Sequence, residues 1–291
     1  MNKKLFIFFC IIILNINAYT QQIHGKIINS ITKEPLPFST IIIKNDKLSG
    51  AYANEDGEFI IIQKIEKDTL IISCIGYLNK EISIKEFLHD YNSIIELTPT
   101  INQLPTFIAS NINVIPIEIG FIKLNKSIVQ GGIKGGIVLV RIPNEYDTIY
   151  HKITSLNFTF APSVEPGQKH NNGVVRIKLY DCDSNTYEPS QNLLPEDVIL
   201  TIPNPLFPWS KDVINVDISK YNIQFPSNGI FLGLEWLGEK KNNLIYNISP
   251  VVCYSRDITE YSSRSSFFGR KFINTFDARD KRVPMFGITI K

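Results

Sequence analysis

The chain has 291 residues, with 30 lysines and arginines against 28 aspartates and glutamates. Lys3 and Lys4 lie in a leader that we expect to be removed, which leaves 28 basic against 28 acidic residues. A neutral protein has no general electrostatic attraction for nucleic acid, so we predict no nucleic-acid partner.

Residues 1–20 predict a secretory signal peptide. Lys3 and Lys4 precede the apolar run 5–14, and polar or small residues follow it. This order of basic, apolar and polar segments is typical of signal peptides. A membrane anchor needs about 20 apolar residues, and Asn15 ends the run too early. We therefore expect an exported protein whose mature chain has no transmembrane segment.

Residues 22–98 predict a small β-sandwich domain. Short segments of β-branched and aromatic residues, such as 39–43 and 69–75, alternate with Gly, Pro, Asn and Asp. This spacing is typical of antiparallel strands joined by turns, and no helix of ordinary length fits the region. The segment Asn54–Gly57 predicts a hairpin connection in which Gly57 adopts a positive φ.

Three sequence blocks in this domain carry a family resemblance. They are 25–43 (GKIINSITKEPLPFSTIII), 54–60 (NEDGEFI) and 72–77 (ISCIGY). In this order they resemble the carboxypeptidase-regulatory-like domain that is common in exported proteins of the Bacteroidota. The resemblance implies a transthyretin-like, seven-stranded Greek-key sandwich. In that family the domain is an accessory unit of some metallocarboxypeptidases and of many TonB-dependent outer-membrane receptors, so the matching residues imply a fold and no catalytic role.

The rest of the chain predicts a linker at 99–112 and a second β-sandwich at 113–291. Apolar and polar residues alternate in segments such as 156–160 and 230–236, which is typical of half-buried strands. Eight or more such strands favour a jelly-roll-like sandwich and an all-β chain. The polar and aromatic segment 261–270 predicts a long surface loop. A weaker similarity to an uncharacterised β-sandwich that often follows the regulatory-like domain is carried by residues 177–183, 192–195, 216–223 and 233–236.

Cysteine spacing excludes two kinds of site. No pair has C-x-x-C spacing, which excludes a zinc ribbon and a thioredoxin-like site. Cys182 and Cys253 are the single pairing available within the second domain. Spacing alone leaves open whether they form a disulfide.

The sequence contains no local catalytic signature. None of its four histidines has a carboxylate or a second histidine three or four residues later, so a zinc peptidase site is not expected. Nucleophile-elbow and phosphate-loop glycine patterns are absent. We interpret Glu235 as a polar residue on the outer face of a strand, in preference to a glycosidase carboxylate. We predict no cofactor and no catalytic residue, with a hydrolase site assembled from distant residues as an alternative.

Aromatic residues of the second domain are the candidates for a ligand-binding surface. A flat ring can stack on a sugar face, and proline-containing loops favour exposure, although large aromatic residues also fill cores. The candidates are Trp209, Tyr187, Phe207 and Tyr221.

Asp181 and Asp183 are weak candidates for a calcium site. They flank Cys182 at the end of a predicted strand, and Ser184 and Asn185 follow them. Calcium takes six to eight oxygen ligands, but Asp and Asn are also the ordinary residues of a strand-ending turn. We favour the turn and predict no metal.

These observations predict an exported, non-catalytic binding or docking module of the cell envelope. The resemblance implies the periplasm or the outer surface of a Gram-negative bacterium. The partner is predicted to be an envelope protein or a glycan, and the sequence does not choose between them. A carbohydrate-binding jelly roll is the first alternative, and a hydrolase with a non-local site is the second.

Overall fold

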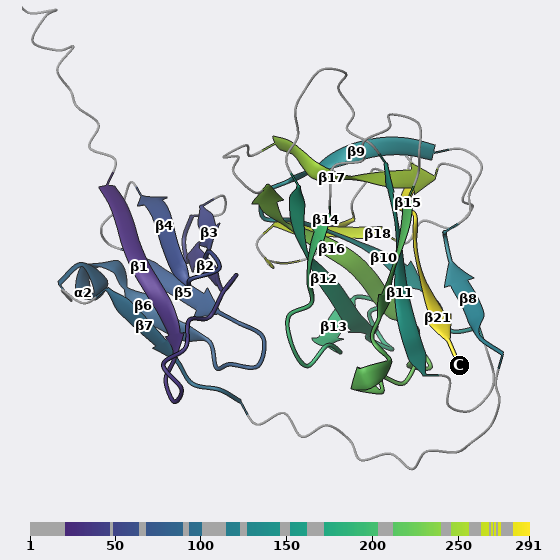
Figure 1. The fold of residues 1–291 in the computed structure, drawn as a ribbon, viewed down its shortest axis with the longest axis horizontal. Helices are drawn as coiled ribbons and strands as arrows, with labels where there is room; N and C mark the ends of the chain where they lie inside the picture. Colours follow the sequence, from purple (N-terminus) through teal and green to yellow (C-terminus); the bar gives the residue numbers. More distant parts are fainter. Residues whose placement is uncertain are drawn as a thin grey trace, which may run out of the picture. The chain divides into compact units, whose positions relative to one another are not determined.

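The structure, a computed structural model, divides into two compact units (Figure 1). Unit 1 takes the described residues of Met1–Ile72 and Asn79–Leu97, and unit 2 takes those of Ser73–Leu78 and Thr98–Lys291. The predicted signal peptide 1–20 and residues 101–112 of the predicted linker lie outside the described residues. Within the described part of the chain, no helix has both the length and the apolar character needed to cross a membrane. The described residues are 21–46, 49–63, 68–89, 93–100, 115–122, 127–145, 152–161, 172–202, 212–239, 246–255, 263–267, 269, 271, 273–274 and 282–291.

The described residues of unit 1 form a β-sandwich of seven strands with one short helix, in agreement with the sequence prediction. One sheet has the strand order β4-β1-β7, and the other has the order β3-β2-β5-β6. Alternate strand residues, among them Ile27, Phe59 and Leu70, are buried and form its core. The elements are β1 (Gln21–Asn29), β2 (Thr40–Ile43), β3 (Gly50–Tyr52), β4 (Glu58–Gln63), β5 (Thr69–Ser73), β6 (Lys80–Ser83), α2 (Ile84–His89) and β7 (Ile94–Leu97).

The turn Asn54–Gly57 does not close a hairpin, contrary to the sequence prediction. It lies between β3 and β4, and these strands belong to different sheets. Gly57 has the expected positive φ, at 76°, and the Asn54 side chain accepts hydrogen bonds from the N–H groups of Asp56 and Glu58. The same turn residues serve hairpins and sheet-to-sheet connections, so the local sequence identifies the turn but not the strands that it joins.

Unit 2 is a larger sandwich of two sheets, and it completes the predicted all-β fold. The β12 sheet has the order β13-β12-β16-β10-β18-β19, with β14 also paired to β12. The β11 sheet has the order β20-β17-β11-β21-β8, with β15 paired to β11 and β9 to β17. The elements are β8 (Ile117–Gly120), β9 (Ser127–Ile133), β10 (Gly136–Ile142), β11 (Ile153–Ala161), β12 (Gly173–Cys182), β13 (Pro189–Asn192), β14 (Ile199–Ile202), β15 (Asp212–Asp217), η1 (Ser219–Tyr221), β16 (Ile230–Glu239), β17 (Tyr246–Ser255), β18 (Ser263–Phe267), β19 (Ile273–Asn274), β20 (Val283–Pro284) and β21 (Phe286–Ile290).

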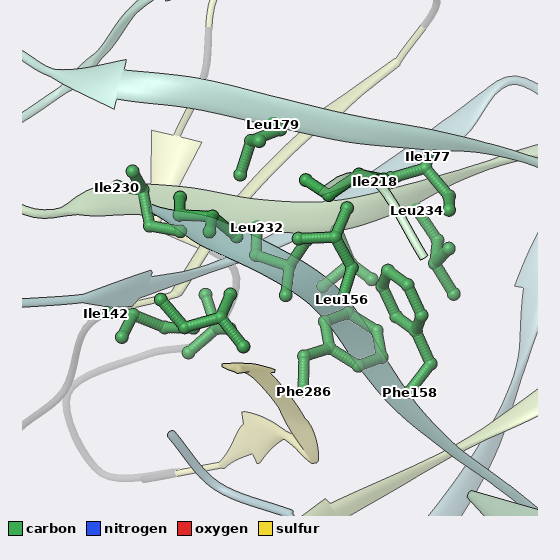
Figure 2. Packing of buried hydrophobic residues seen from close by; sticks show 14 of the residues in the cluster. Ile142, Leu156, Phe158, Ile177, Leu179, Ile218, Ile230, Leu232, Leu234 and Phe286 are labelled. Carbon is green, nitrogen blue, oxygen red and sulfur yellow. The ribbon is translucent and has the colours of Figure 1, made fainter. Parts of the chain in front are cut away.

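The core of unit 2 joins side chains from the two sheets in one apolar cluster (Figure 2). Phe158 and Phe286 come from the β11 sheet, and Ile177, Leu232 and Leu234 come from the β12 sheet. The alternation predicts Phe158, Leu232 and Leu234 as apolar positions of half-buried strands, and all five residues are fully buried. The period-two pattern therefore identifies the inner face of each sheet correctly.

Residues 263–267 form strand β18, so the prediction of a surface loop at 261–270 is wrong for these five residues. The strand pairs with β10 on one side and with β19 on the other. Its sequence, Ser-Arg-Ser-Ser-Phe, has little β-branched character, so the pairing partners and not local propensity determine its conformation. Arg264 is thereby fixed on the sheet.

Cys182 and Cys253 are not joined by a disulfide, because both are thiols. Cys182 ends β12 and packs with Ile137 and Phe231, whereas Cys253 lies on β17 and packs with a different group of apolar residues. The two thiols therefore belong to different sheets and different apolar clusters.

Thiol counting tests this arrangement. A chain that begins at Gln21 contains Cys74, Cys182 and Cys253, and we expect all three to react with a thiol reagent in denaturant without prior reduction. In the native protein we expect Cys74, which is partly exposed, to react much faster than the two buried thiols. A count that rises by two after reduction would show that a disulfide had formed.

Candidate functional site

The four aromatic residues predicted to bind ligand are not gathered in one described cluster. Trp209 and Phe207 lie outside the described residues. Tyr187 lies in the turn between β12 and β13, and Tyr221 is the last residue of η1. The two tyrosines make separate sets of contacts.

Tyr187 presents a half-exposed ring that one arginine holds in place. The residue is 53% exposed, and its φ of 53° lies in the left-handed region, which is uncommon for a bulky side chain. Its N–H donates to the carbonyl oxygen of Asp183 at 3.0 Å. The guanidinium of Arg141 lies 4.9 Å from the ring centroid, a cation–π contact. The turn and the arginine together fix the ring at the surface.

A second arginine, Arg264, binds the residue that follows Tyr187. Glu188 follows Tyr187, and its Oε2 accepts a hydrogen bond from Nε of Arg264 at 2.8 Å. The Arg264 guanidinium also lies 5.8 Å from the ring centroid of Phe231. Phe231 is directly paired with Arg141 on the neighbouring strand, so their side chains share one face of the sheet. We call Arg141, Tyr187, Glu188, Phe231 and Arg264 the Tyr187 site.

The calcium candidate Asp183 supports the turn that carries Tyr187. Its Oδ1 accepts hydrogen bonds from the N–H and hydroxyl of Thr186 and from the N–H of Asn185. These hydrogen bonds, that from the Thr186 N–H above all, hold the pKa of Asp183 below its ordinary value. Oδ1 of Asp181 is buried and accepts no hydrogen bond. Among the described residues, no group of three or more His, Cys, Asp or Glu side chains is placed to hold a metal ion.

Tyr221 uses its hydroxyl for contacts within the protein. The hydroxyl donates to Oε1 of Glu196 at 2.5 Å, and Nζ of Lys220 donates to the same oxygen at 2.8 Å. Lys220 also lies 4.6 Å from the centroid of the Tyr221 ring. The Lys220 hydrogen bond, followed by that of Tyr221, lowers the pKa of Glu196. The polar end of Tyr221 is therefore engaged already.

Four charged residues form a buried network on the outer face of the β12 sheet, which sequence reasoning missed. Oε2 of Glu235 lies 2.9 Å from Nη1 of Arg176 and 2.9 Å from Nζ of Lys178. Oδ1 of Asp197 lies 3.1 Å from Nε of Arg176. Glu235 is on the outer face as expected, but it is only 1% exposed, and Arg176 is 3% exposed. Two cations and two anions balance one another, which indicates a structural network.

Asp197 is the member of this network with the poorest hydrogen bonding. Neither of its carboxylate oxygens makes a hydrogen bond with the described residues. Burial raises the pKa of Asp197, and the attraction of Arg176 and Lys178 offsets this only in part. Burial favours the neutral carboxyl, because a charged carboxylate loses its hydration there.

The raised pKa of Asp197 predicts a pH-dependent mutational effect. The Asp197 carboxyl binds its proton more tightly in the folded protein than in the unfolded chain. Its contribution to the free energy of unfolding therefore falls as the pH rises above the ordinary pKa of 3.8. Asp197→Asn removes the titration. We expect the free energy of unfolding of the variant, relative to that of wild type, to increase from pH 4 to pH 7, as measured by urea unfolding. A relative stability that worsens with pH would show that the folded-state pKa is lowered.

The fold and these contacts define a protein of two β-sandwich units, with a surface cluster of aromatic and basic groups on the second. Residues 23–107 match the family model of the CarboxypepD_reg-like domain, which confirms the family predicted for unit 1. This is a family of non-catalytic β-sandwich domains. Comparison with curated proteins and with solved structures gave no match to the chain.

Proposed function

We propose that this protein is an exported, non-catalytic binding module of the cell envelope, and that unit 2 binds its ligand at the Tyr187 site. Export to the periplasm or the outer surface is supported by the leader at 1–20 and by the resemblance of unit 1. The non-catalytic role is supported by the family that matches residues 23–107.

One observation carries the choice of site: Tyr187 is half exposed, and the guanidinium of Arg141 packs against its ring in the ligand-free protein. A tyrosine supplies a large, rigid contact surface at low cost in side-chain entropy. Preorganisation of this kind favours affinity, because less conformational freedom is lost on binding. Tyr221 is less exposed than Tyr187, and its hydroxyl is already bound to Glu196.

The geometry favours a glycan over a protein partner. A flat ring can stack on a sugar face, and the hydrogen-bonding groups of Glu188 and Arg141 lie beside it. Pockets for small ligands combine such aromatic surfaces with a few polar groups that fix orientation.

A glycan array with three alanine variants tests the proposal. We expect the protein to bind a glycan, Tyr187→Ala to abolish the signal, and Tyr221→Ala to retain it. Trp209→Ala is included because the sequence favours that residue. Thermal melting of each variant shows whether a lost signal reflects a lost fold.

Two results would contradict the proposed site. Binding that survives Tyr187→Ala and is lost with Trp209→Ala would place the ligand on the residues around 209. No glycan signal, together with an envelope protein that a pull-down recovers from wild type and from Tyr187→Ala equally, would replace the glycan by a protein partner at another surface.

A further inference from the structure

The Tyr187 site has one arginine more than it has carboxylates. Arg264 is paired with Glu188 at 2.8 Å. Arg141 has no carboxylate within ion-pair distance among the described residues; its described partners are the carbonyl oxygen of Asn228, at 3.3 Å, and the ring of Tyr187. Arg141 therefore has no ion-pair partner in the described part of the protein.

Arg141 also has an unused hydrogen-bond donor. Its Nε is buried and makes no hydrogen bond. A buried donor that is left without an acceptor is unfavourable, so such groups in native proteins call for an explanation. Because Nε itself is buried, a ligand meets the other nitrogens of the guanidinium, and a carboxylate there can supply the missing opposite charge.

We infer that the Tyr187 site recognises an acidic sugar, a glycan unit that bears a carboxylate. This inference rests on the proposed glycan-binding function and adds the chemical class of the ligand. The sugar ring stacks on the exposed face of Tyr187, and the carboxylate accepts hydrogen bonds from Arg141. A planar guanidinium suits this task because its geometry matches that of a carboxylate.

The nearby Asp183 is not paired with Arg141 among the described residues. Its Oδ1 accepts three hydrogen bonds from Asn185 and Thr186 within its own turn. Glu188 is likewise held by Arg264. Both acidic groups beside Tyr187 thus have donors of their own, and Arg141 remains available.

A paired glycan panel tests the inference. Each oligosaccharide that carries uronic or sialic acid is presented beside its methyl ester, which has the same ring without the charge. We expect the full mature protein to bind at least one acid on the order of 10- to 100-fold more tightly than its ester. Arg141→Gln should remove this difference, Arg141→Lys should retain part of it, and Tyr221→Phe should leave it unchanged.

Each remaining outcome has a definite meaning. Equal binding of acids and esters, lost with Tyr187→Ala, would overturn the acidic specificity and leave the proposed function intact. Binding to acidic peptides but to no sugar, with the same dependence on Arg141, would overturn the inference that the ligand is a sugar. Absence of any binding by a folded wild-type protein would overturn both the inference and the proposed function.

Discussion

Replacing Glu235 by alanine is expected to destabilise unit 2 by about 3–5 kcal/mol. The Glu235 carboxylate is buried and lies 2.9 Å from each of two cations, Arg176 and Lys178. Its removal takes away the carboxylate that lies between these two cations, while Asp197 stays 3.1 Å from Nε of Arg176. Breaking a buried ion pair on one side costs this much because the other charge stays buried without compensation.

The measurement is urea unfolding, followed by a probe specific to unit 2. Trp236 serves as a fluorescence probe, because it lies on β16 in the core of that unit. The control is Glu196→Ala, which breaks an exposed ion pair with Lys220 in the same unit. Exposed pairs contribute little to stability. An equal loss in the two variants would show that water reaches the Glu235 network.

The sequence predicts the inner faces of the sheets better than the outer ones. Phe158, Leu232 and Leu234 follow the alternation of half-buried strands, and they are buried as expected. Arg176 and Glu235 follow the same alternation at the polar positions, where exposure is the ordinary expectation. They are separated by 59 residues and meet because they are paired in the register of β12 with β16. That register is a tertiary property, so no local pattern predicts the buried network.

The candidate site was predictable in part for a similar reason. Tyr187 stands out in the sequence as an aromatic residue near turn-forming residues, and the structure places it in a turn. Arg141 and Arg264 reach the site through β10 and β18, which pair with each other. The segment containing Arg264 has the composition of a loop, so its place in the sheet depends on strands far away in the chain. Sequence reasoning could therefore nominate the ring but not the arginines that give the site its charge.

Replacing Phe158 by alanine is expected to destabilise unit 2 by about 3–5 kcal/mol, for a reason unrelated to charge. Phe158 is fully buried in the cluster that joins the two sheets (Figure 2). Its ring packs edge to face on Phe286 at a centroid distance of 5.0 Å and lies 6.3 Å from the ring of Phe160. Alanine removes these contacts and leaves a cavity that close-packed neighbours fill only in part.

Two further variants separate the cavity from other causes. Phe158→Leu retains much of the buried volume and should cost clearly less than Phe158→Ala. Val213→Ala, on the neighbouring strand β15, changes a residue that is 45% exposed and should have little effect. If Phe158→Ala costs no more than Val213→Ala, the cluster does not hold the sheets together. If Phe158→Ala loses the most unfolding free energy, Phe158→Leu less and Val213→Ala least, then stability depends on the packed volume between the sheets. The surface cluster around Tyr187 then rests on a rigid support.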